Sequence, residues 1–152
     1  MPVRFANLFG ARTRGLEGSL RARLATGWRG EVGATLFSFT GKPAAHSRDV
    51  TLEAIDGAAP EVQAFVRSGW QGGPSEVDLF VSRVGPVRSS HVPAYTRLDL
   101  RYEHRLTARV AAMVTAQNLL QAEHVEARPD DVLLMPTAVP RSVGIALRWR
   151  VR

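Results

Sequence analysis

Apolar side chains recur at every second position in seven stretches of this 152-residue chain. The last stretch is the clearest, because from Val143 to Val151 one set of alternate residues is Val, Ile, Leu, Trp and Val, while the other is small or charged. Successive side chains of a β-strand point to opposite faces, so this period predicts strands with one apolar and one polar face. The seven stretches are residues 16–24, 28–36, 61–70, 76–82, 96–103, 107–118 and 143–151.

Two of these stretches are less regular. Phe37 and Phe39, which follow the second stretch, fall on its polar set of positions. Either a β-bulge near Ser38 re-aims them, or they point to the polar face. Residues 107–118 are small and apolar on both sets, but their β-branched residues and the lack of helix-capping signals favour a strand over a helix.

The connections between the stretches alternate in length. The short ones are residues 25–27, 71–74 and 105–106, and the long ones are residues 41–60, 85–93 and 121–140. Short turns at one end and long loops at the other are typical of outer-membrane barrels, whose periplasmic turns are short. The sequence therefore predicts an all-β fold, an antiparallel meander of about seven transmembrane strands that forms part of an outer-membrane β-barrel.

The aromatic residues support a membrane location. If the C-terminus lies in the periplasm, Trp28, Trp70, Tyr102 and Trp149 all fall near the periplasmic rim and on the apolar set of positions. Indole and phenol rings prefer the boundary between lipid and water, so these four residues are predicted to form a periplasmic aromatic girdle. The alternative is a small soluble β-barrel or sandwich that binds a ligand or a partner, in which the apolar rows pack against each other in a closed core.

Four short motifs, in order along the chain, resemble segments of TonB-dependent outer-membrane receptors. Arg14-Gly15-Leu16-Glu17 resembles the opening of an earlier strand, and Gln117-Asn118-Leu119-Leu120 the end of a later one. Val92-Pro93-Ala94-Tyr95-Thr96-Arg97-Leu98-Asp99-Leu100-Arg101 resembles a signature of the last strands. Val139-Pro140-Arg141-Ser142-Val143 resembles the lead into the closing strand. The resemblance identifies residues 1–152 as a partial receptor barrel domain that holds the C-terminal strands and no plug domain.

The resemblance implies a barrel of roughly 22 strands with a plugged lumen in the bacterial outer membrane. It implies energised uptake of a scarce nutrient such as a ferric siderophore. The implied partners are outer-membrane lipid, the barrel assembly machinery and, in the full-length receptor, a TonB-like energy-coupling protein and a small-molecule ligand. Residues 1–7 lack the apolar core of a secretory signal, and neither a plug nor a TonB box is recognisable. We therefore expect this chain, as part of a longer receptor, not to be active alone.

The polar faces of the predicted strands supply the candidate site residues. They are either a ligand path or, as we favour, a wet lumen wall whose charges pair across strands. The lumen-facing candidates are Glu17, Arg21, Arg23, Arg97, Asp99, Arg101, Glu103, Arg148 and Arg150. A second candidate site lies in the closing strand. Its residues Ser142, Gly144, Leu147 and Trp149 resemble the C-terminal signal that the assembly machinery reads. The alternative is that they show only the pattern of any final amphipathic strand.

Other function classes find little support. The formal charge is +6 and the pI about 11.1, but the arginines are scattered and not clustered, so no nucleic-acid partner is expected. No window has the roughly 18 uninterrupted apolar residues of a membrane helix. The chain has no cysteine, which excludes a disulfide framework and a thiolate metal site.

Metal and catalytic motifs are also missing. His46, His91, His104 and His124 match no metal-binding spacing, and the three outside the strands are expected to be solvated in outer loops. The acidic pair Asp130-Asp131 follows a proline and is predicted to form a turn, not an acid–base couple. The sequence contains no nucleophile elbow or phosphate-binding loop. We therefore expect no cofactor, no metal and no enzymatic activity.

Overall fold

The computed structural model describes residues 9–45, 47, 55–128 and 135–151. His46, Asp130, Asp131 and the N-terminal residues 1–7 lie outside the described residues. Among the described residues, no helix has the length and the apolar character needed to cross a bilayer.

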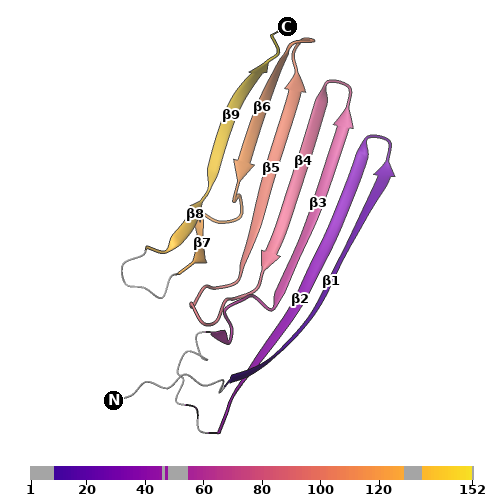
Figure 1. Cartoon of the computed structure of the whole chain (residues 1–152). Coiled ribbons are helices and arrows are strands. Elements are labelled where there is room, and N and C mark those ends of the chain that lie inside the picture. The colour runs from indigo at the N-terminus through magenta and orange to yellow at the C-terminus, as the bar shows by residue number, and fades with distance from the viewer. Residues whose placement is uncertain (1–8, 46, 48–54, 129–134, 152) are drawn as a thin grey trace.

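The described chain folds as an all-β structure, as predicted. Seven strands form one antiparallel sheet in the order β1-β2-β3-β4-β5-β6-β9, and β7 and β8 pair as a separate hairpin (Figure 1). The sheet is open, with β1 and β9 as its edges. The strands are β1 Phe9–Ala25, β2 Trp28–Pro43, β3 Val62–Gly72, β4 Ser75–Val84, β5 Tyr95–Arg105, β6 Val110–Gln117, β7 Glu123–Ala127, β8 Thr137–Pro140 and β9 Ser142–Trp149.

The predicted alternation of short and long connections is confirmed. Residues 26–27, 73–74 and 106–109 join successive strands at one end of the sheet, which is the upper end in Figure 1 and the end where the described chain finishes. The first of these turns requires a glycine, because Gly27 has a φ of 77° and a Cβ there would overlap the carbonyl oxygen of Gln71. The Gln71 N–H donates to the carbonyl oxygen of Gly27 at 2.8 Å, so the first two turns support each other.

The register carries the two-sided pattern across the whole sheet. Directly opposed residues of antiparallel strands point to the same face, so each row of partners belongs to one face. One such row runs Trp28, Trp70, Val77, Tyr102, Val114 and Ile145. We name the face that holds this row the apolar face, and the opposite one the charged face.

The apolar face is not covered by any other described part of the chain. The exposed fraction of Leu20 is 69% and that of Ile145 is 80%. Among the described residues, the buried hydrophobic ones are only Val92, Ala111 and Ala116. The apolar rows thus form one exposed belt and do not build the closed core that a sandwich requires.

Strands β1 and β2 are longer than predicted. Gly15 pairs with Phe37 and Thr13 with Phe39 in an unbroken register, and the irregularity in this pair of strands lies elsewhere, between residues 23 and 25. The predicted bulge near Ser38 is therefore absent. Phe37 and Phe39 point to the charged face, which was the second of the two sequence-based alternatives.

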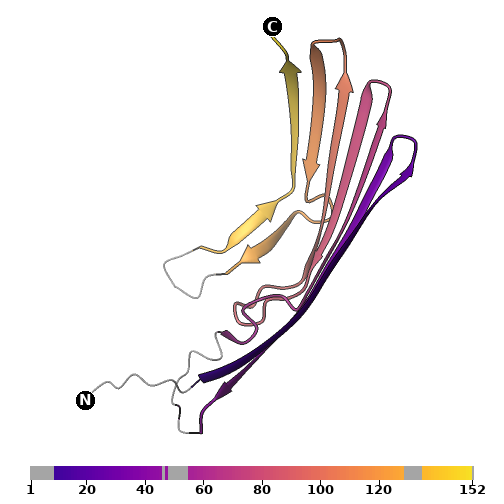
Figure 2. The ribbon, with the colours of Figure 1, turned by 45° about the vertical axis from the view of Figure 1, so that its right-hand side comes forward.

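The hairpin β7–β8 was not predicted. It lies within residues 121–140, which were predicted to form a long loop. Figure 2 shows the hairpin leaning away from the sheet at the end where the long connections lie. Its short strands, of 5 and 4 residues, are interrupted by an irregularity between Val125 and Ala127.

Candidate functional site

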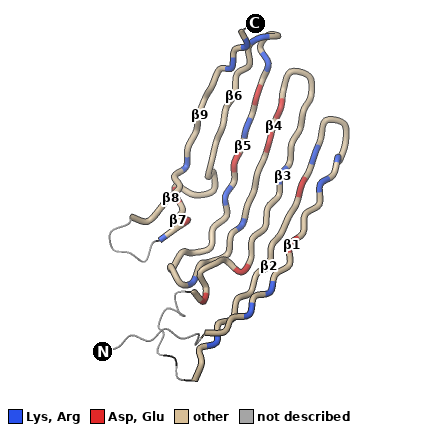
Figure 3. Tube along the Cα trace, in the orientation of Figure 1, with Lys and Arg blue, Asp and Glu red and all other residues tan. Residues whose placement is uncertain are grey.

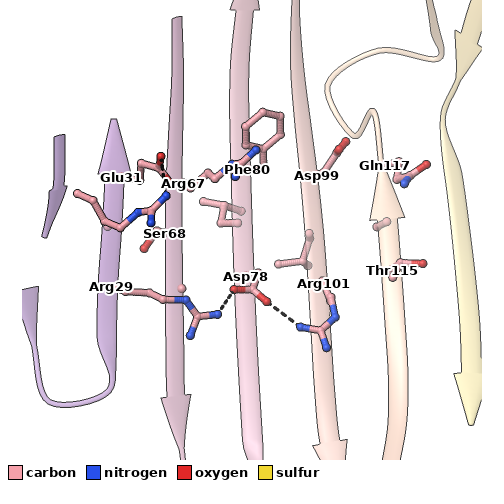
Figure 4. Close-up of a pocket in the computed structure, with 16 residues that line it drawn as sticks. Arg29, Glu31, Arg67, Ser68, Asp78, Phe80, Asp99, Arg101, Thr115 and Gln117 are labelled. Atoms are coloured by element: carbon pink, nitrogen blue, oxygen red, sulfur yellow. Dashed lines mark hydrogen bonds and ion pairs between the residues drawn. The ribbon is translucent and has the colours of Figure 1, made fainter. Parts of the chain in front are cut away.

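A groove of about 660 Å³ runs across the charged face from β1 to β6. Residues from two rows of register partners build most of its floor, and Figure 4 labels eight of them: Arg29, Glu31, Arg67, Asp78, Phe80, Asp99, Arg101 and Thr115. The first row runs Arg21, Glu31, Arg67, Phe80 and Asp99. The second row runs Arg23, Arg29, Gly69, Asp78, Arg101, Thr115 and Gly144. Because each row crosses the strands at right angles, residues far apart in sequence become neighbours.

The centre of the second row is an arginine–carboxylate–arginine bridge. Arg29 Nη2 donates to Asp78 Oδ1 at 2.5 Å and to Glu76 Oε1 at 2.9 Å. From the other side, Arg101 Nη1 donates to Asp78 Oδ2 at 2.8 Å and lies 3.6 Å from Glu76 Oε1. Each carboxylate is thus shared by two arginines, and the bridge ties β2 to β4 and β4 to β5.

The same network continues to the edge of the sheet. Glu103 is only 8% exposed, and its two carboxylate oxygens are paired with Arg101 and Arg148. The network therefore reaches from β2 to β9. An isolated exposed ion pair contributes about 0–1 kcal/mol, but members of a network with fixed geometry restrain each other.

Arg29 reaches Asp78 by crossing over β3 at a glycine. A Cβ on Gly69 would lie 2.6 Å from Arg29 Nε and 2.9 Å from Asp78 Oδ1. Any side chain at this position would therefore lie in the path between the two charged groups. We infer that the absence of a side chain on Gly69 is what permits the bridge between β2 and β4.

We expect Gly69→Ala to lower the free energy of unfolding by about 1–3 kcal/mol, because the methyl group displaces a partly buried ion pair. The matched control is Gly18→Ala in β1, where a Cβ would meet nothing within 4 Å. The control should change the free energy by less than about 0.5 kcal/mol. Urea titrations of tryptophan fluorescence, with the chain bound to phosphatidylcholine vesicles, measure both. Equal midpoints for the two variants would contradict the proposed role of Gly69.

Arg67 is the cation of the groove that no described carboxylate pairs. Its guanidinium carbon lies 4.9 Å from the ring centroid of Phe80 and 5.4 Å from that of Phe65. Contacts of this kind stabilise a cation by about 0.5–1 kcal/mol at exposed sites. These contacts account for the two phenylalanine rings that lie beside the charged side chains of the groove.

A buried polar cluster joins the β7–β8 segment to the charged face. Asn118 is fully buried, and its side-chain amide donates to the carbonyl oxygen of Val139 at 2.9 Å. His124 Nδ1 lies 3.0 Å from Asn118 Oδ1, and the imidazole stacks on Tyr95 with ring centroids 4.1 Å apart. The Asn118 N–H donates to Asp99 Oδ1 at 3.0 Å, so the cluster is anchored on β5.

The prediction that the loop histidines are solvated is wrong for His124, which is 6% exposed. Its Nε2 lies 2.9 Å from Glu126 Oε1, so both ring nitrogens have partners. His91 is exposed, and His104 lies in β5 within 2.9 Å of Ser75 Oγ. In the described part of the chain, no group of three or more His, Cys, Asp or Glu residues could hold a metal ion.

We expect Asn118→Ala to release the segment that follows it. Asn118 has a φ of 54°, a conformation that costs alanine about 1–2 kcal/mol, and its buried partners lose their hydrogen bonds. Tryptic cleavage after Arg141, whose N–H donates to the carbonyl oxygen of Ala122 at 2.7 Å, should accelerate by roughly 30-fold or more, equivalent to about 2 kcal/mol of local stability. The control Asn118→Gly also removes the side chain, but glycine adopts the positive φ of this position without strain. It should therefore accelerate cleavage less than Asn118→Ala does. An unchanged cleavage rate in the alanine variant would contradict this account.

The lumen-facing candidates that belong to strands all lie on the charged face. They are Glu17, Arg21 and Arg23 in β1, Arg97, Asp99, Arg101 and Glu103 in β5, and Arg148 in β9. Arg21 pairs with Glu31 at 3.2 Å and Arg97 with Asp99 at 2.8 Å, while Arg101, Glu103 and Arg148 belong to the network. Arg150 follows the end of β9, where its N–H donates to the carbonyl oxygen of Arg109 at 3.0 Å.

The four aromatic residues assigned to a girdle lie on the apolar face, toward the end with the short turns. Trp28, Trp70 and Tyr102 belong to one row, and the two indole rings have centroids 6.3 Å apart. Trp149 lies at the end of β9, opposite Val110. Their contact with lipid stays a prediction.

The residues of the predicted assembly signal divide between the two faces of the edge strand β9. Ser142 and Gly144 lie on the charged face, opposite Gln117 and Thr115. Leu147 and Trp149 lie on the apolar face, and all four are exposed. Recognition by the assembly machinery stays a prediction.

The centre of the network, formed by Arg29, Glu76 and Asp78, was not among the predicted site residues. All three fall on the polar set of positions in their strands, and that signal was present. What was missing is the register, because only the pairing of β2, β3 and β4 shows that these side chains meet.

Chemically, the fold and the site define an open antiparallel sheet with an exposed apolar face and a charge-paired face. The arrangement suits a wall that holds polar groups in place, because most of its carboxylates are already bound by arginine. Comparison with protein-family models, curated proteins and solved structures gave no match for this chain.

Proposed function

We propose that this chain forms the C-terminal wall of the barrel of a TonB-dependent outer-membrane receptor. In this proposal its seven strands span the bacterial outer membrane, with the apolar face toward lipid and the charged face toward the lumen. The complete receptor would take up a scarce nutrient such as a ferric siderophore, driven by a TonB-like energy-coupling protein. Without the rest of the receptor, these 152 residues would not transport.

The observation that carries the proposal is the exposed apolar face, continuous over seven strands. A water-facing sheet of this size would expose far more apolar surface than the few hundred Å² typical of a soluble monomer. A bilayer removes that cost, since lipid covers the belt. The strands between β1 and β9 are paired with a neighbour on both sides, and such pairing satisfies backbone groups within the sheet, as hydrocarbon demands.

The distribution of polar residues over the apolar face supports the same orientation. Near the short turns, Ser75 Oγ lies 2.9 Å from His104 Nδ1 and 3.3 Å from the Tyr102 hydroxyl. These groups border the tryptophans on the end of the belt that the proposal assigns to the periplasm. Rings with one polar edge are stable at such a boundary.

On the charged face, the ion-pair network supports a lumen wall in place of a ligand path. The carboxylates of Glu76, Asp78 and Glu103 are each paired with arginine, so few charges are left for a small ligand. A plug or lumen water would face this wall in the receptor. The nutrient's identity would be decided by parts of the receptor other than these strands.

The test compares two neighbouring positions of β1. The chain has no cysteine, so Leu20→Cys and Ser19→Cys each give a single site for a spin label. In chain bound to phosphatidylcholine vesicles, a label at position 20 should collide mainly with oxygen, which dissolves in hydrocarbon. A label at position 19 should collide mainly with a water-soluble nickel complex. Equal accessibility at the two positions, or recovery of the receptor from cells without detergent, would contradict the proposal.

A further inference from the structure

The polarity of the apolar face changes abruptly at the ends of β1 and β2 that lie away from the short turns. Up to the pair Leu16 and Leu36, the positions of this hairpin that lie on the apolar face, here called outward positions, carry apolar residues or glycine. Beyond this pair, the outward positions carry Arg14, Arg12 and Lys42. Figure 3 shows these basic residues gathered at the lower ends of the two strands.

No carboxylate in the described part of the chain compensates the charge of these basic residues. Arg12, Arg14 and Lys42 are exposed, and none forms an ion pair with a described carboxylate. No Asp or Glu occupies an outward position anywhere in β1 or β2, since Glu17 and Glu31 lie on the charged face. The three cations, together with the exposed hydroxyl groups of Ser38 and Thr40, line a shallow groove of about 410 Å³. We call these five residues the basic patch.

The opposite face of the same hairpin changes in the reverse sense. There Phe9 stacks on Phe39 with ring centroids 6.5 Å apart. Phe37 and Phe39 also line a small pocket of about 180 Å³ together with residues 55–59 and Glu61. At this end of the hairpin, the charged face therefore carries aromatic rings that contact residues 55–59, and the apolar face carries the basic patch. The exchange of polarity between the faces marks the level at which the row of exposed apolar side chains ends.

The dimensions place the basic patch at the depth of lipid headgroups. From Trp28 to Leu36 the apolar side of β2 spans ~26 Å along the strand at ~3.3 Å per residue. With a strand tilt of ~40°, this corresponds to ~20 Å along the membrane normal, close to the ~25 Å apolar band of outer-membrane barrels. Ser38 and Arg14, which are partners in the register, lie only two residues beyond Leu36 and Leu16.

We propose that the basic patch binds the phosphate of an anionic lipid headgroup in the leaflet that faces the long loops. The assignment rests on the proposed function, because it needs the apolar face to lie in a bilayer. The acyl chains of the bound lipid lie against Leu16, Leu20 and Leu36, which continue directly from the patch. An acidic protein or a nucleic acid would complement the charge but not the adjoining leucines. Arginine and lysine bind phosphate through charge-assisted hydrogen bonds, and the hydroxyl groups add donors.

Vesicle flotation tests the proposal with the full 152-residue chain, diluted from urea into vesicles. One set of vesicles contains phosphatidylcholine alone, and the other contains phosphatidylcholine with phosphatidic acid. Each basic residue near an anionic surface strengthens binding about fivefold, or ~1 kcal/mol. Arg12→Gln with Arg14→Gln should therefore lower binding to the anionic vesicles roughly 30-fold and leave binding to phosphatidylcholine unchanged.

The control variant carries Arg21→Gln and Arg23→Gln, which remove the same charge from the opposite face of the same strand. This variant should keep the preference for phosphatidic acid. Equal losses in the two double variants would overturn the basic patch, because binding would then follow net charge alone. Loss of the preference on adding inorganic phosphate, but not chloride of equal ionic strength, would assign the patch to a free anion and also overturn it. If the unmodified chain binds neither kind of vesicle, the proposed function fails; if it binds both equally, only this inference fails.

Discussion

Replacing Ile145 with arginine should lower the free energy of unfolding of the vesicle-bound chain by ~2–4 kcal/mol, the cost of a cation on the lipid side near the bilayer midplane. The same replacement at the next residue, Ala146, should cost less than ~1 kcal/mol, because that position is on the charged face. Both positions lie in the middle of β9 and both are exposed. In water, neither substitution would remove a contact that contributes much to stability, because both side chains are exposed. A difference in the free energy of unfolding between the two variants would therefore come from lipid.

Urea titrations of tryptophan fluorescence in phosphatidylcholine vesicles measure both variants against the unmodified chain. Circular dichroism at zero urea checks that each variant has formed strands before the titration begins. A difference of less than ~0.5 kcal/mol between the two variants would mean that both faces meet the same solvent. The assignment of the apolar face to lipid would then be wrong, and so would the barrel that depends on it.

The faces of the strands could be predicted from the sequence because alternation is a local property. Ile145 and Trp149 differ from Gly144 and Arg148 by a shift of one residue, and no knowledge of the neighbouring strand is needed to see it. The turns could be predicted for the same reason, since Gly72-Gly73-Pro74 is a turn signal within a few residues. Phe37 and Phe39 stayed ambiguous, because a bulge is a property of the pairing between two strands.

The polar contacts could not be predicted, because they depend on how strands pair. Arg29 and Asp78 are 49 residues apart, and their contact needs the registers of two strand pairs and the missing side chain of Gly69. His124 was expected to be solvated because the segment around it is rich in Pro, Asp and Glu. Its burial follows from the left-handed backbone of Asn118, which folds the next residues back onto β5. An asparagine at a strand end is a signal for such a turn, but it does not say which residues the turn will bring together.

The largest effect is expected from the open edges of the sheet. Strand β1 has 17 residues and β9 has 8, and neither is paired along its outer edge. In hydrocarbon, each unpaired backbone group costs several kcal/mol, so the sheet can span a bilayer only where strands of other copies or of other barrel segments pair with β1 and β9. In water, the same edges offer templates for pairing with further chains.

Seven strands are also too few to remove these edges by closing. The smallest common membrane barrels have ~8 strands, and a receptor lumen is enclosed by roughly 22. The exposed belt adds a second drive toward association, since apolar side chains such as Leu20 and Ile145 would be covered by other copies. In the proposed receptor, further strands of the same barrel pair with the edges of β1 and β9, and lipid covers the apolar belt.

We therefore expect the 152-residue chain alone to form aggregates or large oligomers in plain buffer. Detergent should lower the size of these particles by covering the belt, but it should not produce a transporting monomer, because micelles do not pair backbone edges. Size-exclusion chromatography with light scattering gives the size in both media, and circular dichroism during heating gives the cooperativity of unfolding. A monodisperse monomer that melts cooperatively in buffer would require the belt and both edges to be covered by the chain itself. That outcome would favour the soluble ligand-binding module over the barrel wall.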